Sequence, residues 1–234
     1  MKTAHFQSFL DDSEPDAGPA RLTALRKAIS GAQLNGFLVP RSDVHQGEYV
    51  AKCDERLAWL TGFTGSAGFC AVLPDVAGVF VDGRYRVQVK VQTNATFTPV
   101  DWPETSLPTW LQKNLQTGTI GFDPWLHSWG EIKAHRTALG ENGIQLRPNT
   151  NLIDQIWTDR PDPPNAQAYA YPDDYAGETH SDKRKRLAKM LRDNAQDTAI
   201  LTLPDSIVWL LNMRGSDVTH VPLVHSFAFL HADA

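Results

Sequence analysis

Cysteine and long apolar runs are scarce in this sequence. The 234 residues include two cysteines, Cys53 and Cys70, which are too few for a disulfide framework or a structural zinc centre and are typical of a reducing compartment. No stretch approaches the ~18 consecutive apolar residues that indicate a membrane span. Residues 1–20 carry acidic side chains and no apolar run, unlike a secretory signal peptide. We therefore expect a cytoplasmic protein with no membrane partner.

Basic charge is also in short supply. The chain has 22 lysines and arginines against 27 acidic residues, which gives a net charge of -5. Proteins that bind nucleic acids generally carry an excess of basic residues, so we expect no nucleic-acid partner. Hydrophobic residues make up 41% of the chain. At ~100–200 residues per domain, this ordinary composition fits one large globular domain or two small ones.

Periodic apolar residues predict the elements of the first part of the chain. Leu22, Leu25 and Ile29 recur at helical spacing, and a short apolar run at residues 37–39 stops at Pro40, as a buried strand does. A second helix is expected over residues 48–60. Two apolar runs, residues 69–73 and 79–81, lie on either side of Pro74-Asp75 and predict a hairpin.

The segment after the hairpin is ambiguous at one point. Val87, Val89 and Val91 alternate with polar residues, which favours a strand by period, but no turn signal follows Tyr85 and a helix is equally compatible. Strands are expected at residues 96–100 and 119–122, with helices at 106–115 and 128–139. Helices and strands that alternate in this way indicate an α/β layered domain with a mixed sheet.

Prolines divide the chain near residue 160. Four of them, Pro161, Pro163, Pro164 and Pro172, fall in a short acidic segment that cannot continue a helix or a central strand. Beyond it, a helix at Arg186 and an apolar strand that stops at Pro204 repeat the opening pattern. We therefore predict a loose leader over residues 1–20, an α/β domain over 21–160, a linker over 161–176 and an incomplete related α/β domain over 177–234. A second domain that stops at this point has an unfinished sheet, so we expect a truncated chain.

Metal and nucleophile motifs are incomplete. Asp217, His220 and His225 form the densest group of possible zinc ligands, although a polar turn before a strand is the favoured interpretation. The glycine-rich segment 62–68 lacks the Lys-Ser or Lys-Thr of a phosphate-binding loop.

Ser66 lies in that segment and is a candidate nucleophile that His45 and Asp43 would support. However, the predicted order of helix, turn and strand does not suit a nucleophile elbow. A tight glycine turn is the alternative.

Two further basic features are open to more than one interpretation. Residues 183–186 are consecutive lysines and arginines, which suit either a nucleic-acid contact or the solvated face of a helix capped by Ser181 and Asp182. Arg84 follows a predicted strand at a turn, where a guanidinium can bind a carboxylate or a carbonyl, or else pair with a neighbouring loop. The residues themselves give no complete catalytic constellation.

Five segments resemble the N-terminal region of the three-domain Xaa-Pro aminopeptidases, also called aminopeptidase P. They are residues 42–51, 60–68, 81–85, 151–161 and 209–218, in that order along the chain. The resemblance implies a creatinase/prolidase N-terminal-like layered domain with a mixed sheet, followed by a truncated second copy of a related α/β domain. It also implies a metallopeptidase that releases the N-terminal residue preceding proline.

The same resemblance implies which residues are missing. In this family two divalent metal ions, manganese or zinc, are bound by two Asp, one His and two Glu of a C-terminal domain, which this chain lacks. We therefore expect no catalytic residue, no metal ligand and no cofactor in this chain, and no activity of the chain alone. The full-length enzyme is expected to be a homodimer that acts on peptides with proline in second position.

The resemblance assigns a role to one residue of this chain. Arg84 matches an arginine of the first domain that contacts bound peptide at the mouth of the active site, so it is the expected substrate-binding residue. Two alternatives stay open. One is a relative of the prolidase or creatinase type, and the other is a stand-alone binding module without peptidase activity.

Overall fold

The computed structural model describes residues 13–233, which form two compact units. The first contains residues 13–41, Arg56–Pro124 and Ser128–Thr158, and the second contains Ser42–Glu55, Trp125–His127 and residues 159–233. The second unit thus includes residues 42–55 and 125–127, which the predicted domain boundaries placed in the first domain. The short helix η1 (Pro15–Ala17) and the helix α1 (Gly18–Gly31) begin inside the segment expected to be a loose leader, whose residues 1–12 lie outside the described part.

A mixed sheet forms the centre of the first unit. Within the described residues it has six strands: β1 (Gly36–Pro40), β2 (Phe69–Val72), β3 (Ala77–Val81), β4 (Thr98–Asp101), β5 (Gly118–Phe122) and β6 (Ile144–Pro148). Their order is β4-β3-β2-β1-β5-β6. The β1–β2 and β2–β3 pairs are antiparallel, and the β3–β4, β1–β5 and β5–β6 pairs are parallel. The predicted α/β class with a mixed sheet is confirmed.

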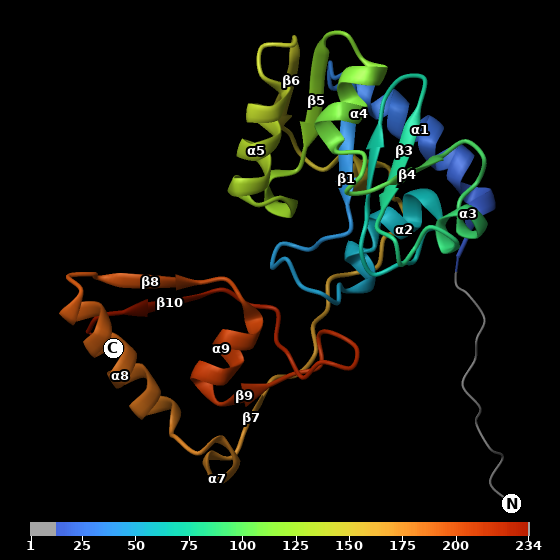
Figure 1. Cartoon of the computed structure of the whole chain (residues 1–234). Coiled ribbons are helices and arrows are strands. Elements are labelled where there is room, and N and C mark those ends of the chain that lie inside the picture. The colour runs from blue at the N-terminus through green and yellow to red at the C-terminus, as the bar shows by residue number, and fades with distance from the viewer. Residues whose placement is uncertain (1–12, 234) are drawn as a thin grey trace, which may run out of the picture. The chain divides into compact units, whose positions relative to one another are not determined.

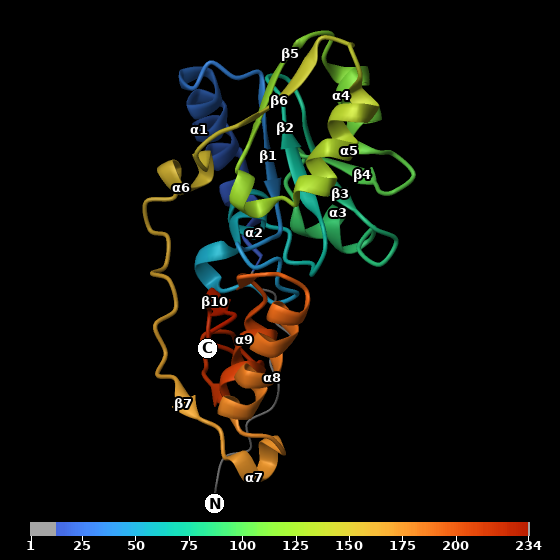
Figure 2. The same ribbon diagram turned by 90° about the vertical axis from the view of Figure 1, so that its left-hand side faces the viewer.

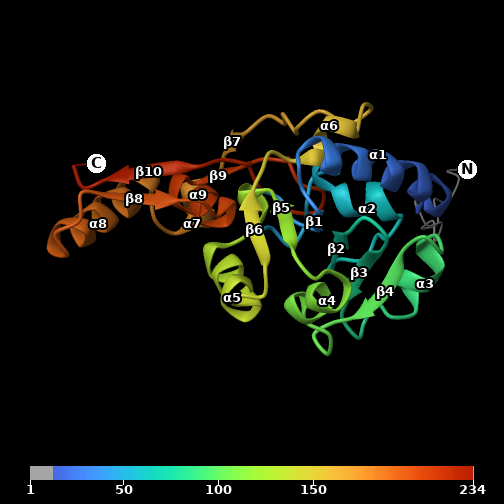
Figure 3. The ribbon, with the colours of Figure 1, turned by 90° about the horizontal axis from the view of Figure 1, so that it is seen from above.

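Helices cover both faces of this sheet (Figure 3). The helices of the unit are α1, α2 (Arg56–Thr61), α3 (Gln88–Gln92), α4 (Leu107–Asn114), α5 (Trp129–Leu139) and α6 (Leu152–Ile156). Figure 2 shows α1 and α6 on one side and α4 and α5 on the other. The period-two alternation of β1 explains the two layers, because Phe37 and Val39 join the cluster beneath α1 whereas Leu38 joins the cluster beneath α4 and α5.

Serine caps explain why two of the predicted helices begin where they do. The Ser106 side chain accepts a hydrogen bond from the Thr109 N–H at the start of α4, and the Ser128 side chain accepts one from the Glu131 N–H at the start of α5. Such caps satisfy backbone donors that have no partner within the helix. The expected helices at residues 106–115 and 128–139 are confirmed, as is the hairpin of β2 and β3.

The structure shortens one expected helix and decides one alternative that the sequence left open. The helix expected over residues 48–60 is reduced to the short helix η2 (Lys52–Asp54) and to α2. The strand favoured at residues 87–91 is α3, in which Val89 is buried while Val87 and Val91 are exposed. A single buried valine is compatible with a short helix as well as with a strand, so the alternation of valines did not distinguish the two.

The second unit is built on a small antiparallel sheet (Figure 1). Strands β8 (Thr198–Leu201) and β10 (Ala228–His231) pair with each other, and the helices α8 (His180–Asp193) and α9 (Pro204–Leu211) pack against them. The unit also contains β7 (Tyr169–Ala170), α7 (Asp173–Ala176) and β9 (Met213–Arg214). Because β7 pairs with β9, the end of the expected linker is part of the ordered unit.

Candidate functional site

Arg84 lies in the turn that follows β3, where the backbone N–H of Tyr85 donates to the carbonyl of Asp82. The Asp82 carboxylate accepts from the Arg84 backbone N–H at 2.9 Å, from Nε at 3.1 Å and from Nη2 at 2.8 Å. The Arg84 side chain is nevertheless 66% exposed. These hydrogen bonds from Arg84 hold the pKa of Asp82 below its usual range. The Arg84 guanidinium is therefore exposed to solvent while the Asp82 carboxylate holds one side of it in place.

A tyrosine supports the same guanidinium. The Arg84 Cζ lies 5.1 Å from the centre of the Tyr85 ring, within the range of a cation–π contact. The ring of Phe63 meets Tyr85 edge-on at 5.6 Å, and the hydroxyl groups of Tyr85 and Ser66 share a hydrogen bond at 2.5 Å. Asp82 thus accepts hydrogen bonds from the edge of the Arg84 guanidinium, and the Tyr85 ring lies against its face.

The glycine-rich segment is a tight turn that lies on the core. Gly62 has φ +86°, and a Cβ built there would lie 2.3 Å from the Gln92 carbonyl oxygen. A Cβ on Gly65 would lie 2.2 Å from the Phe63 ring. Only glycine fits such positions without strain. Of the two interpretations that the sequence allowed for this segment, the tight turn matches this geometry and the phosphate-binding loop does not.

The hypothesis of a serine nucleophile finds no support. Ser66 belongs to the first unit and its hydroxyl pairs with Tyr85. Asp43 and His45 belong to the second unit, where His45 Nδ1 lies 2.9 Å from the carbonyl oxygen of Thr202. Because a carbonyl only accepts, Nδ1 is the donor of that bond. The structure therefore gives each of these side chains a different partner.

The zinc hypothesis is wrong in its ligands. The Asp217 carboxylate accepts the backbone N–H groups of Ala166 at 2.9 Å and of His225 at 2.8 Å, and so fixes the loop around it. His220 is exposed and has φ +67°. Nowhere in residues 13–233 do three or more His, Cys, Asp or Glu side chains form a group that could hold a metal ion. The polar-turn alternative describes this segment.

His225 instead faces a carboxylate that the sequence did not connect with it. Its Nε2 lies 3.8 Å from Oδ2 of Asp43, a residue that is 1% exposed. The other oxygen of Asp43 accepts the backbone N–H groups of His45 and Gly47, each at 2.9 Å. The His45 ring lies 5.0 Å from that of His225. No local pattern connected His225 with Asp43 and His45, because it lies far from them in sequence.

The basic run at residues 183–186 is not uniformly solvated. Lys183 is 2% exposed, and its ammonium donates to the Asn212 side-chain oxygen at 2.7 Å and to the Trp209 carbonyl at 2.9 Å. The ammonium also lies 4.4 Å from the centre of the Trp209 ring. Lys185 and Arg186 are exposed, as the interpretation of a solvated helix face predicts. Lys183 instead joins α8 to the end of α9.

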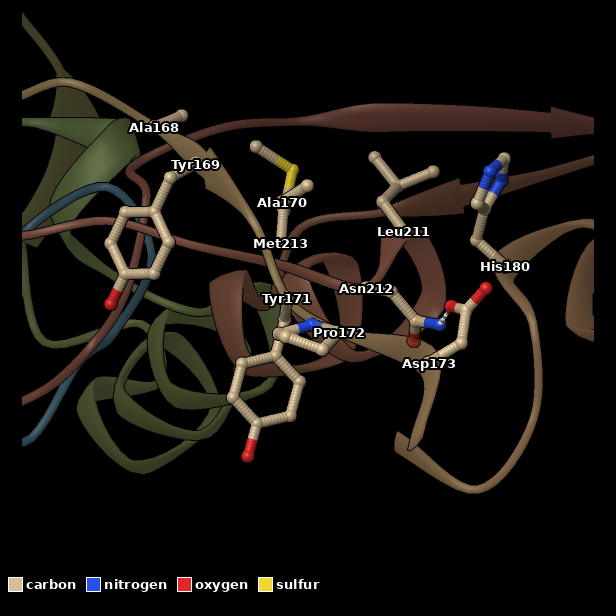
Figure 4. A pocket seen from close by; sticks show the side chains of 10 residues that line it. All are labelled: Ala168, Tyr169, Ala170, Tyr171, Pro172, Asp173, His180, Leu211, Asn212 and Met213. Atoms are coloured by element: carbon tan, nitrogen blue, oxygen red, sulfur yellow. Dashed lines mark hydrogen bonds between the residues drawn. The ribbon is translucent and has the colours of Figure 1, made fainter. Parts of the chain in front are cut away.

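A groove of about 660 Å³ lies beside these residues in the second unit (Figure 4). Tyr169, Tyr171 and Met213 line it, and its carboxylate, Asp173, accepts a hydrogen bond from the Asn212 side chain at 2.7 Å. Arg214 lies over the Tyr171 ring at 4.2 Å. Two polar side chains of the groove, Asp173 and Asn212, are therefore bonded to each other.

Two family models match the chain, and both describe the creatinase/prolidase N-terminal domain. One covers residues 21–156 and the other residues 159–234. The chain belongs to the creatinase/prolidase N-terminal domain family. The resemblance drawn from the sequence motifs is confirmed, and the shared description of the two matches agrees with the predicted second copy of a related domain.

The curated relatives of this creatinase/prolidase N-terminal chain are peptidases. It is 35% identical over 217 residues to Xaa-Pro aminopeptidase 2 of Sus scrofa and 32% identical over 222 residues to aminopeptidase P2 of Arabidopsis thaliana. These alignments cover 90% and 91% of this chain but 32% and 31% of the relatives. The chain therefore spans about a third of the length of the relatives it matches.

A solved structure gives the same picture. The X-prolyl aminopeptidase of Caenorhabditis elegans, described as a cytosolic enzyme with a di-nuclear active site, matches with a TM-score of 0.84 and 30% identity. The match covers 92% of this chain and 37% of that enzyme. The described residues of this chain do not fit a di-nuclear centre, since no three potential metal ligands among them lie together. In the described part of the chain no helix is long and apolar enough to cross a membrane.

Proposed function

We propose that this chain is the non-catalytic N-terminal portion of a metal-dependent Xaa-Pro aminopeptidase, which releases the N-terminal residue preceding proline. The main support is identity of 32–35% to such enzymes along about nine-tenths of the chain. The proposal locates the two divalent metal ions, manganese or zinc, outside this chain. It also implies peptide substrates with proline in second position, a homodimeric full-length enzyme and, from the cytosolic relative, a cytoplasmic location.

Within this function, Arg84 is the residue that contacts substrate. Its guanidinium is exposed and yet oriented by Asp82 and Tyr85, so it is suited to bind a carboxylate or carbonyl group of a short peptide. Arginine binds such groups through paired N–H donors in a fixed plane. The chain would then influence which peptides reach the metal ions and would not take part in bond cleavage.

Peptide kinetics test both parts of the proposal. The enzyme that contains this chain followed by a peptidase domain is assayed with Arg-Pro-Pro and with Ala-Pro, and the chain alone is assayed in parallel with manganese. We expect hydrolysis of Arg-Pro-Pro by the enzyme and none by the chain alone. A preference for Ala-Pro would favour the prolidase alternative, and hydrolysis by the chain alone would contradict the non-catalytic assignment.

Variants of the turn test the role of Arg84. Arg84→Ala is expected to raise KM roughly tenfold or more, as the loss of a charge-assisted hydrogen bond does, with little change in kcat or metal content. Arg84→Lys should recover part of the loss. Arg86→Ala is the matched control, because Arg86 is paired with Asp101 and Glu104. Unchanged kinetics in Arg84→Ala would remove Arg84 from the substrate site.

A further inference from the structure

The arrangement around Arg84 contains a tyrosine and a serine with no assigned role. Tyr85 is half-buried between the exposed guanidinium of Arg84 and the buried ring of Phe63. Its hydroxyl is held by Ser66, which comes from the distant glycine turn between α2 and β2. The ring is therefore held at its hydroxyl and by a T-shaped contact with Phe63, whereas the Arg84 side chain beside it is largely exposed.

The position of Ser66 is itself well defined. Gly65 lies so close to the Phe63 ring that no side chain fits between them, and Phe63 is 1% exposed. The turn that carries Ser66 therefore lies directly on the core. A hydroxyl anchored there restrains the Tyr85 ring relative to the sheet. A tyrosine ring has two side-chain torsions, and the contacts with Phe63 and with the Ser66 hydroxyl restrict both.

An exposed arginine normally loses conformational freedom when it binds a ligand, which weakens the affinity. Asp82 restricts the Nε and Nη2 side of the guanidinium, and the face of the Tyr85 ring restricts its tilt. A group that is ordered before the substrate arrives loses less entropy on binding.

We propose that Tyr85, fixed by the hydroxyl of Ser66, is a positioning residue that orders the Arg84 guanidinium for peptide binding. The inference rests on the proposed function of Arg84. It also explains why Ser66 and a tight glycine turn accompany the Arg84 turn in a part of the chain that forms no nucleophilic site.

Paired variants measure the effect in the enzyme. Tyr85→Phe and Ser66→Ala each remove the shared hydrogen bond and should raise KM roughly three- to tenfold, the range for one neutral hydrogen bond, with kcat unchanged. The double variant should match either single variant, since both changes remove the same contact. Tyr49→Phe, which alters an exposed tyrosine in the second unit, is the matched control and should behave like the wild type.

A double-mutant cycle separates positioning from general stability. In an Arg84→Ala background, Tyr85→Phe should cause no further rise in KM, because the group that it orders is gone. An equal rise in both backgrounds would overturn the inference and show that Tyr85 acts through the fold. If circular dichroism shows that Tyr85→Phe does not fold, Ser66→Ala takes its place in the double-mutant cycle with Arg84→Ala.

A measurement on this chain itself does not depend on catalysis. The heteronuclear NOE of the Arg84 Nε–Hε group reports its order on the ps–ns timescale and should fall in Tyr85→Phe and Ser66→Ala but not in Tyr49→Phe. An unchanged NOE overturns the inference. A reduced NOE with unaltered KM in both Tyr85→Phe and Arg84→Ala means that the substrate role of Arg84 has failed, while the ordering by Tyr85 stands.

Discussion

Arg56 and Asp154 form a two-point ion pair that joins α2 to α6. Arg56 Nε lies 2.6 Å from one carboxylate oxygen of Asp154, and Nη2 lies 3.0 Å from the other. The Arg56 side chain is 5% exposed and that of Asp154 is 29% exposed. Both helices lie against α1. The pair therefore connects the last helix of the first unit to an early one across 98 positions of sequence.

Loss of one partner of this pair should destabilise the protein. Asp154→Ala leaves the buried Arg56 guanidinium without its carboxylate, so we expect a loss of about 2–3 kcal/mol in the free energy of unfolding, somewhat below the range for fully buried pairs because Asp154 is partly exposed. Urea denaturation followed by circular dichroism measures it. Asp75→Ala, in the exposed hairpin turn, should change stability by no more than about 0.5 kcal/mol. Equal effects of the two variants would contradict this account.

Lys183 and Lys185 stand two residues apart on α8 and should respond differently to the same substitution. Lys183→Met keeps the apolar stem but removes the lysine donor to the Asn212 side-chain oxygen, and the Trp209 carbonyl keeps only the Asn212 backbone N–H. The expected cost is about 1–3 kcal/mol, as for unsatisfied buried acceptors. Lys185→Met alters an exposed position and should be nearly neutral. Denaturation midpoints compare them, and a neutral Lys183→Met would show that the buried contacts contribute nothing net.

The pH dependence of the Arg84 turn follows from Asp82. Hydrogen bonds from Arg84 lower the pKa of Asp82 in the folded chain, so the contribution of this pair is present above the usual pKa of an aspartate and is lost as pH falls through the lowered value. The carboxyl ¹³C shift of Asp82 should therefore titrate at higher pH in Arg84→Gln than in the wild type. Arg86→Gln should cause a smaller change, because Arg86 acts on Asp82 only through its charge. An unaltered titration in Arg84→Gln would mean that the contact is absent in solution.

Cys70 should be inert towards thiol reagents while the chain is folded. It is fully buried in β2, and burial raises the pKa of its thiol. Since the thiolate is the reactive form, labelling of a Cys53→Ser variant at about pH 8 should proceed only through opening of the core. The labelling rate should rise in urea in parallel with global unfolding. Fast labelling of the native protein would contradict the burial of Cys70.

The local sequence pattern was sufficient to predict those elements whose own residues decide their conformation. The apolar run before Pro40, the hairpin around Pro74-Asp75 and the serine caps of α4 and α5 are local signals, and the structure agrees with them. The pattern left α3 undecided between helix and strand, since of the three alternating valines only Val89 is buried. A five-residue segment with one buried valine and one buried glutamine carries too little apolar periodicity to separate a helix from a strand.

The candidate site was only partly visible in the sequence. Motif resemblance singled out Arg84 and its turn, and nothing local showed that Ser66 reaches Tyr85 or that Asp43 faces His225. Both relationships join residues on different elements. Side-chain partners of this kind depend on strand order and helix packing, which a single sequence constrains weakly.

The sequence by itself determined the α/β class, the repeated opening pattern and the family, because periodicity, turn residues and motifs are local properties. Tertiary structure alone decided how the Arg84 guanidinium is held, why Lys183 is buried in a basic run, and which acidic and histidine side chains meet. The physical reason is that hydrogen bonds and burial depend on distances in space. Those distances are set only when the sheet is assembled and its faces are covered.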